Sequence, residues 1–223
     1  MPDLRTVHAK GPWQVDLAPG GGPDLVIAFA SIGHDPARMP SPEFVGSASA
    51  RGRRALFVMD QSRSWATDPG FVPALKAGLA AAGPAARILC IGSSMGAVAA
   101  LCAAPVVNAC ATLAFGPQSD LTDPRWHALT RDLPRPPLPP PHGWTVLFHG
   151  LANDAAQAAG FAQSAGTDHL LFPDLAHSDL TAWLKSRGLL QGLIDSALAT
   201  DRRRLLRIAA GAGAFQRRKQ GKP

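Results

Sequence analysis

The most informative stretch of this chain reads Arg87-Ile88-Leu89-Cys90-Ile91-Gly92-Ser93-Ser94-Met95-Gly96. The apolar run from Arg87 to Ile91 predicts a buried strand, and the Ala-rich stretch from Ala97 to Ala104 predicts a helix directly after it. Between them, two glycines flank Ser94 with the spacing G-x-S-x-G. A strand-to-helix turn this tight tolerates little beyond hydrogen at the glycine positions and lifts the serine hydroxyl above the sheet. The stretch therefore predicts a nucleophile elbow with Ser94 at its tip.

Outward from this turn, short apolar runs alternate with helical stretches. We expect further strands at Leu25–Ala30, Arg54–Met59, Cys110–Phe115, Trp144–Phe148 and His169–Phe172. We expect helices at Phe71–Ala82, Ala155–Ala165, Ser178–Arg187 and Leu189–Ile208. Continuous apolar strands separated by helices indicate a mostly parallel sheet covered on both faces, which is an α/β fold.

Two segments depart from this alternation. Short β-rich pieces before residue 20 predict an antiparallel hairpin at one edge of the sheet. Residues 134–141 read Pro-Arg-Pro-Pro-Leu-Pro-Pro-Pro, which favours an extended polyproline II conformation. We interpret this run as a stiff connector between two strands; a ligand for a proline-binding domain is the alternative.

Length, composition and charge bound the class of protein. The chain has 223 residues, 46% of them hydrophobic and 17% charged, which fits one globular domain. Its formal net charge of +6 arises from residues 201–223, which hold eight basic side chains and one acid. We therefore expect one folded domain over residues 1–200 and a basic tail over residues 201–223. The N-terminus has no basic region followed by an apolar stretch, so we expect a cytoplasmic protein.

A serine needs a base to become a nucleophile, and the base needs an acid to orient it. His177 is the predicted base because it lies in the loop just after the last predicted strand, where a side chain can reach the elbow. Two carboxylates are candidates for the acid. We favour Asp154, just beyond the strand that ends at Phe148, over Asp120, just beyond the strand that ends at Phe115. The ordinary interpretation of Asp120 is a helix N-cap.

The oxyanion of the reaction needs backbone donors. The N–H of Met95, at the start of the helix, is one predicted donor. The second comes from the loop after the strand at 25–30, where Ser31 or Ile32 presents an N–H; we choose Ser31.

These motifs together resemble the α/β-hydrolase superfamily from about residue 25 to about residue 187. The resemblance rests on the Gly92–Gly96 elbow, the His149-Gly150…Asp154 segment and the Ala176-His177-Ser178 loop. It implies an eight-stranded, mostly parallel sheet without a large cap domain, and a triad of Ser94, His177 and Asp154. Family members often carry His-Gly after the oxyanion strand, where this chain has Ala30-Ser31. Residues 55–60 with Ser64-Trp65 are also similar to small bacterial hydrolase-like proteins, some of which accompany surface-polysaccharide genes.

Three functions follow as hypotheses. The first is hydrolysis of a small-molecule carboxylic ester or thioester through an acyl-enzyme. The second is acyl transfer with the same triad, and the third is a non-catalytic hydrolase-like scaffold. We expect no cofactor, no metal and no specific nucleic-acid partner, because Cys90, Cys102 and Cys110 match no zinc spacing and no basic face lies outside the tail. The tail is a candidate for weak contact with a membrane surface or another anion.

Overall fold

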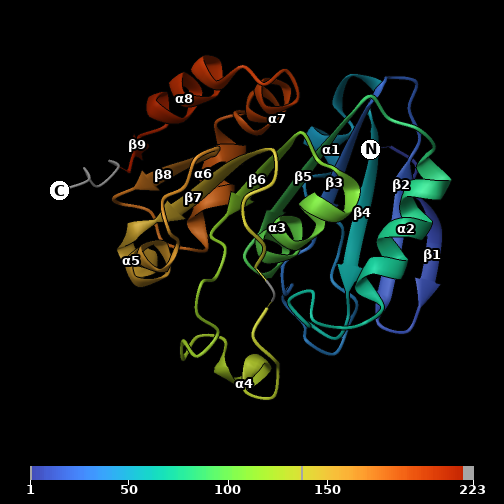
Figure 1. Cartoon of the computed structure of the whole chain (residues 1–223), viewed down its shortest axis with the longest axis horizontal. Helices are drawn as coiled ribbons and strands as arrows, with labels where there is room; N and C mark the ends of the chain where they lie inside the picture. The colour runs from blue at the N-terminus through green and yellow to red at the C-terminus, as the bar shows by residue number, and fades with distance from the viewer. Residues whose placement is uncertain (1, 137, 218–223) are drawn as a thin grey trace.

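A computed structural model describes residues 2–136 and 138–217 of the chain. Within these residues a nine-stranded sheet runs through the molecule in the order β1-β2-β4-β3-β5-β6-β7-β8-β9 (Figure 1). The strands are β1 Arg5–Lys10, β2 Trp13–Ala18, β3 Asp24–Phe29, β4 Arg54–Asp60, β5 Arg87–Ser93, β6 Ala111–Phe115, β7 Trp144–Gly150, β8 Thr167–Phe172 and β9 Phe215–Gln216. Strands β4-β3-β5-β6-β7-β8 are parallel, so the predicted α/β class is confirmed.

The helices alternate with the strands along the chain. They are α1 Val45–Ala48, α2 Phe71–Ala82, α3 Met95–Val107, α4 His127–Thr130, α5 Leu151–Gly160, α6 Asp179–Ser186, α7 Leu190–Leu198 and α8 Arg202–Gly211, with a 3-10 turn at Ala50–Gly52. The predicted helix over 71–82 agrees with α2, whereas the predicted helix over 189–208 is interrupted between α7 and α8.

Burial on both faces explains the continuous apolar strands. In β3, Val26 and Ala28 pack into a core with α1, α6, α7 and α8, whereas Ile27 and Phe29 pack into a second core with α2 and α3. Side chains on a strand alternate between faces, so a strand covered on both faces is apolar at every position.

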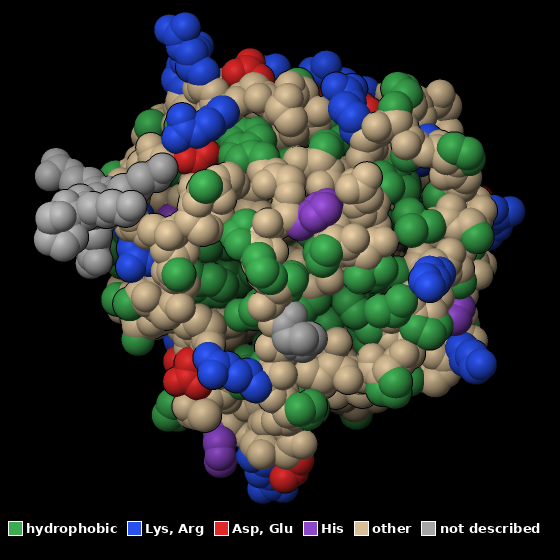
Figure 2. Space-filling model, viewed as in Figure 1, with side chains coloured by type: hydrophobic (Ala, Val, Ile, Leu, Met, Phe, Trp, Pro, Cys, Tyr) green, Lys and Arg blue, Asp and Glu red, His purple; other side chains and the backbone are tan. Residues whose placement is uncertain are grey.

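Both edges of the sheet are antiparallel. At one edge, β1 pairs with β2 and β2 with β4, as the predicted hairpin requires. At the other, β9 pairs with β8. Helix α8 and strand β9 lie within the stretch predicted as a basic tail, and Leu205 and Ala209 of α8 are fully buried in the core. Lysine and arginine side chains gather over this end of the molecule (Figure 2). Residues 218–223 of the predicted tail lie outside the described residues.

The Pro-rich connector lies between β6 and β7. Apart from the single turn of α4, the described residues between 116 and 143 form no regular secondary structure. Figure 1 shows this segment extending from the body of the domain below α3. In the described part of the chain, no helix combines the length and the apolar character that crossing a bilayer requires.

Candidate active site

Ser94 occupies a strained turn between β5 and α3. Its φ of 55° and ψ of −123° lie in a region that residues other than glycine rarely adopt. A Cβ at Gly92 would lie 2.0 Å from the Gly96 carbonyl oxygen, and a Cβ at Gly96 would lie 2.3 Å from the Phe29 carbonyl oxygen. Only hydrogen fits at either position, which is the steric reason for the two glycines. This strained backbone conformation costs free energy, and the surrounding strands and helix keep Ser94 in it.

The structure brings together Ser94, His177 and Asp154. His177 Nε2 lies 3.0 Å from Ser94 Oγ, and His177 Nδ1 lies 2.5 Å from Asp154 Oδ2. His177 lies in the loop between β8 and α6, and its N–H donates to Asn153 Oδ1 at 2.7 Å. The three side chains therefore form a continuous hydrogen-bonded chain from the hydroxyl to the carboxylate.

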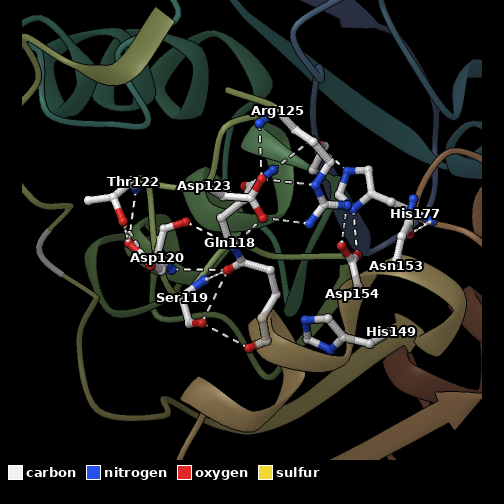
Figure 3. A network of polar contacts seen from close by, with 12 residues as sticks. Gln118, Ser119, Asp120, Thr122, Asp123, Arg125, His149, Asn153, Asp154 and His177 are labelled. Atoms are coloured by element: carbon white, nitrogen blue, oxygen red, sulfur yellow. Dashed lines mark hydrogen bonds and ion pairs between the residues drawn. The ribbon is translucent and has the colours of Figure 1, made fainter. Parts of the chain in front are cut away.

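Asp154 is buried in the first turn of α5, with 1% of its side chain exposed. Arg125 Nη1 donates to its other oxygen at 2.9 Å, so Asp154 lies between a guanidinium and an imidazole (Figure 3). Burial raises the pKa of Asp154, but the hydrogen bond and charge of His177 together with Arg125 outweigh it and hold that pKa below its usual value. The carboxylate is therefore ionised at neutral pH.

Asp120, the other candidate acid, lies away from His177. Its side chain is exposed and accepts from the N–H and hydroxyl of Thr122 (Figure 3). These local bonds lower the pKa of Asp120. The residue closes a turn in the connector between β6 and α4.

The segment between β6 and α4 also supplies a wall of the site, which the sequence analysis did not predict. The ring of Trp126 lies 5.2 Å from that of His177, and the guanidinium of Arg125 stacks 4.3 Å above Trp126. Asp123 fixes Arg125 from its other side at 2.8 Å. No periodicity marks these residues, since they lie in an irregular segment.

Of the predicted oxyanion donors, Met95 and Ser31 have different surroundings. Met95 is the first residue of α3, where a backbone N–H has no acceptor within its own helix. The N–H of Ser31 donates to Glu43 Oε1 at 3.2 Å, and the Ser31 hydroxyl donates to the same oxygen at 2.5 Å. Among the described residues, the N–H of Ile32 has no hydrogen-bond acceptor. Ile32 therefore presents an unoccupied amide next to Ser31.

The site opens into a cavity of about 730 Å³. Its walls include Ser94, His177 and Trp126, together with Glu43 and Lys185. Burial raises the pKa of Glu43, against hydrogen bonds from Ser31 that lower it. Within the described residues, no group of three or more His, Cys, Asp or Glu side chains is placed to hold a metal ion.

The remaining downstream histidines lie away from the serine hydroxyl. His149 and His169 form a buried pair, with His149 Nδ1 2.8 Å from His169 Nε2. Burial lowers the pKa of His149 to about 4 and that of His169 to about 3, so both are neutral at pH 7. His127 is exposed at the start of α4, and His142 contacts Asn108 at 3.1 Å.

Solved structures share this architecture over most of their length. A serine hydrolase without a lid from Xanthomonas campestris matches at 16% identity and a TM-score of 0.53, covering 85% of this chain and 91% of its own. The chain has the α/β-hydrolase fold.

Two further solved structures that match this chain carry different activities in their names. A thermophilic esterase from Thermogutta terrifontis matches at 17% identity and a TM-score of 0.56, over 90% of this chain and 94% of its own. The capsule O-acetyltransferase of Neisseria meningitidis serogroup A matches at 12% identity and a TM-score of 0.59, over 84% and 94%. No protein-family model and no curated protein sequence matches the chain.

Proposed function

We propose that the protein is a serine hydrolase that cleaves a carboxylic ester or thioester through an acyl-enzyme on Ser94. The observation that carries the proposal is the contact of Ser94 Oγ with His177 Nε2 at 3.0 Å, with Asp154 against the opposite nitrogen. The two ring nitrogens of a neutral imidazole differ, and only the unprotonated one accepts a proton. Because Asp154 is an acceptor, it keeps the proton on Nδ1 and leaves Nε2 free to take that of Ser94.

In the first half of the reaction, Ser94 Oγ attacks the carbonyl carbon and its proton passes to His177 Nε2. The carbonyl π electrons move to oxygen, where the amides of Met95 and Ile32 donate to the developing charge. The intermediate collapses, the bond to the leaving alcohol or thiol breaks, and His177 returns the proton to that group. Asp154 stabilises the imidazolium formed in between.

In the second half, water attacks the acyl carbon and gives a proton to His177. The bond from carbon to Ser94 Oγ breaks, the electron pair goes to Oγ, and His177 protonates it. The carboxylic acid leaves and the enzyme is restored. The cavity suits an ester with an apolar group, since Phe44, Val45 and Leu190 line it together with Ser94.

The test is steady-state hydrolysis of short nitrophenyl esters by the parent protein and a Ser94→Ala variant. We expect turnover in the parent and none above background in the variant. Ser93→Ala is the matched control because Ser93 is the neighbouring residue of the same turn, at the end of β5. Equal turnover by the parent and Ser94→Ala would contradict the proposal.

A second candidate, acyl transfer to an alcohol, uses the same residues. Its support is the fold shared with the capsule O-acetyltransferase at a TM-score of 0.59. The two differ only in whether water or an alcohol attacks the acyl-enzyme. Mass analysis of the products with a sugar alcohol added at increasing concentration separates them: hydrolysis yields free acid throughout, whereas transfer yields a new ester that increases with the acceptor.

A further inference from the structure

Gln118, which the sequence analysis did not single out, contacts the serine oxygen directly. Its Nε2 lies 2.7 Å from Ser94 Oγ, closer than His177 Nε2 at 3.0 Å. Gln118 follows β6 and is 1% exposed. A buried amide with this contact is a strong constraint on the nucleophile, because the bond is shielded from water.

Trp65 determines which end of the Gln118 amide faces the serine. The indole Nε1 of Trp65 lies 3.1 Å from Gln118 Oε1, and an indole N–H only donates. The amide oxygen must therefore point to Trp65 and the NH₂ group to Ser94. Trp65 is fully buried, so no water competes for its N–H.

The turn that carries Trp65 is held in an unusual conformation. Arg63, Trp65 and Ala66 have φ values of 50°, 51° and 64°, which are costly for residues with a Cβ. Asp60 Oδ2 accepts from the N–H and the hydroxyl of Ser64, both at 2.7 Å, and so closes the turn. The buried guanidinium of Arg63 donates to backbone carbonyls of the loop that contains Ile32. These contacts hold the strained turn, and the turn in turn places the Trp65 indole against Gln118.

The fixed amide dictates the direction of the serine proton. An NH₂ group cannot accept, so the hydroxyl hydrogen of Ser94 must point to the other neighbour, His177 Nε2. We propose that Gln118 is a further catalytic residue, which aims the Ser94 hydroxyl at His177 and donates to Ser94 Oγ when that oxygen is the leaving group in deacylation. This inference rests on the proposed hydrolase function.

Deacylation is the half-reaction in which the donor acts most strongly. The bond between the acyl carbon and Ser94 Oγ breaks, its electron pair moves to Oγ, and His177 delivers a proton to that oxygen. A hydrogen bond to a charged oxygen is stronger than one to a neutral oxygen. Gln118 Nε2 therefore stabilises the departing oxygen more than the ester that precedes it, which is the condition for faster reaction.

The test separates the two half-reactions in Gln118→Leu, Gln118→Glu and Trp65→Phe. The rate of Ser94 modification by a fluorophosphonate reports attack alone, kcat on a nitrophenyl ester reports both halves, and intact mass reports accumulated acyl-enzyme. For Gln118→Leu we expect kcat to fall about 10- to 100-fold, with a smaller fall in modification and visible acyl-enzyme. Trp65→Phe releases the amide and gives the same pattern more weakly. Gln191→Glu, a partly exposed position on α7 outside the cavity, controls for added charge.

Gln118→Glu keeps the volume and the acceptor for Trp65, so it remains informative if Gln118→Leu fails to fold. Its carboxylate accepts a hydrogen bond from the Ser94 hydroxyl in competition with His177. We therefore expect the rate of Ser94 modification and kcat to fall by similar factors. Parent-like kcat in Gln118→Glu overturns the inference, as does a folded Gln118→Leu without acyl-enzyme. If the folded parent neither reacts nor turns over, the proposed function itself fails, and the role of Gln118 with it.

Discussion

Replacing Asp154 by asparagine tests the proposed acid through the direction of hydrogen bonds. Arg125 Nη1 donates to Asp154 Oδ1 at 2.9 Å, and Asp123 keeps Arg125 in place. In Asp154→Asn, the amide oxygen must stay on Arg125, because a guanidinium only donates. The NH₂ group then faces His177 Nδ1, which must accept and therefore lose its proton. The proton moves to Nε2, where it blocks transfer from Ser94.

The expected loss is large because the wrong tautomer removes the base altogether. The equivalent asparagine substitution in a serine protease triad lowers kcat by about 10⁴-fold, which corresponds to about 5.4 kcal/mol of barrier. We expect kcat to fall about 10³- to 10⁴-fold here, since the Asp154 side chain is 1% exposed and water cannot easily replace its carboxylate. Fold stability is expected to change little, because the side-chain volume is retained.

The assay is kcat at neutral pH on a nitrophenyl ester, with Asp120→Asn as the matched control. Asp120 is exposed and bonded to Thr122, so its variant should keep parent activity. Adding Arg125→Met to Asp154→Asn frees the amide to turn its oxygen to His177, and we expect part of the activity to return. Near-parent kcat in Asp154→Asn, or an equal loss of kcat in Asp120→Asn, would contradict Asp154 as the acid that orients His177.

Three further outcomes follow. Gly116→Ala should lower kcat strongly with a smaller loss of stability, since a Cβ there lies 2.9 Å from His177 Cε1 and the glycine has a φ of +59°; unchanged kcat would contradict this. The unfolding free energy in urea should fall as pH drops from about 6.5 towards 4, because burial lowers the pKa of His149 to about 4 and of His169 to about 3, so the unfolded chain binds more protons; a profile flat over that range argues against it. Glu43→Gln should raise kcat/KM, because it removes the negative charge that lies on the Ser31 amide, beside the proposed position of the oxyanion. A lower kcat/KM would show instead that the Glu43 carboxylate assists the reaction.

The elbow could be predicted from sequence because its constraints are local. The spacing of Gly92 and Gly96 reflects steric contacts within one turn, and the apolar runs reflect burial of each strand on both faces. His177 was predicted by its place after the last parallel strand, and it lies 3.0 Å from the serine hydroxyl. The role of each residue in a reaction stays a prediction.

The supporting contacts could not be predicted because they join distant segments. Gln118 and Trp65 are 53 positions apart, and they meet only when the strained turn after β4 packs against the segment that follows β6. Asp154 and Asp120 each follow a strand, and their surroundings in three dimensions separate them. Ser31 was chosen as a donor for its position in the loop, but nothing in the sequence indicates that Glu43 accepts from its N–H.

The most direct test of Ser94 as an activated nucleophile is covalent trapping. The folded parent is treated with a fluorophosphonate, and the modified peptide is identified by mass spectrometry beside Ser94→Ala and His177→Ala. We expect one adduct, on the peptide that carries Ser94, with none in Ser94→Ala and strongly slowed formation in His177→Ala. No adduct in the folded parent, or the same adduct in Ser94→Ala, would contradict it.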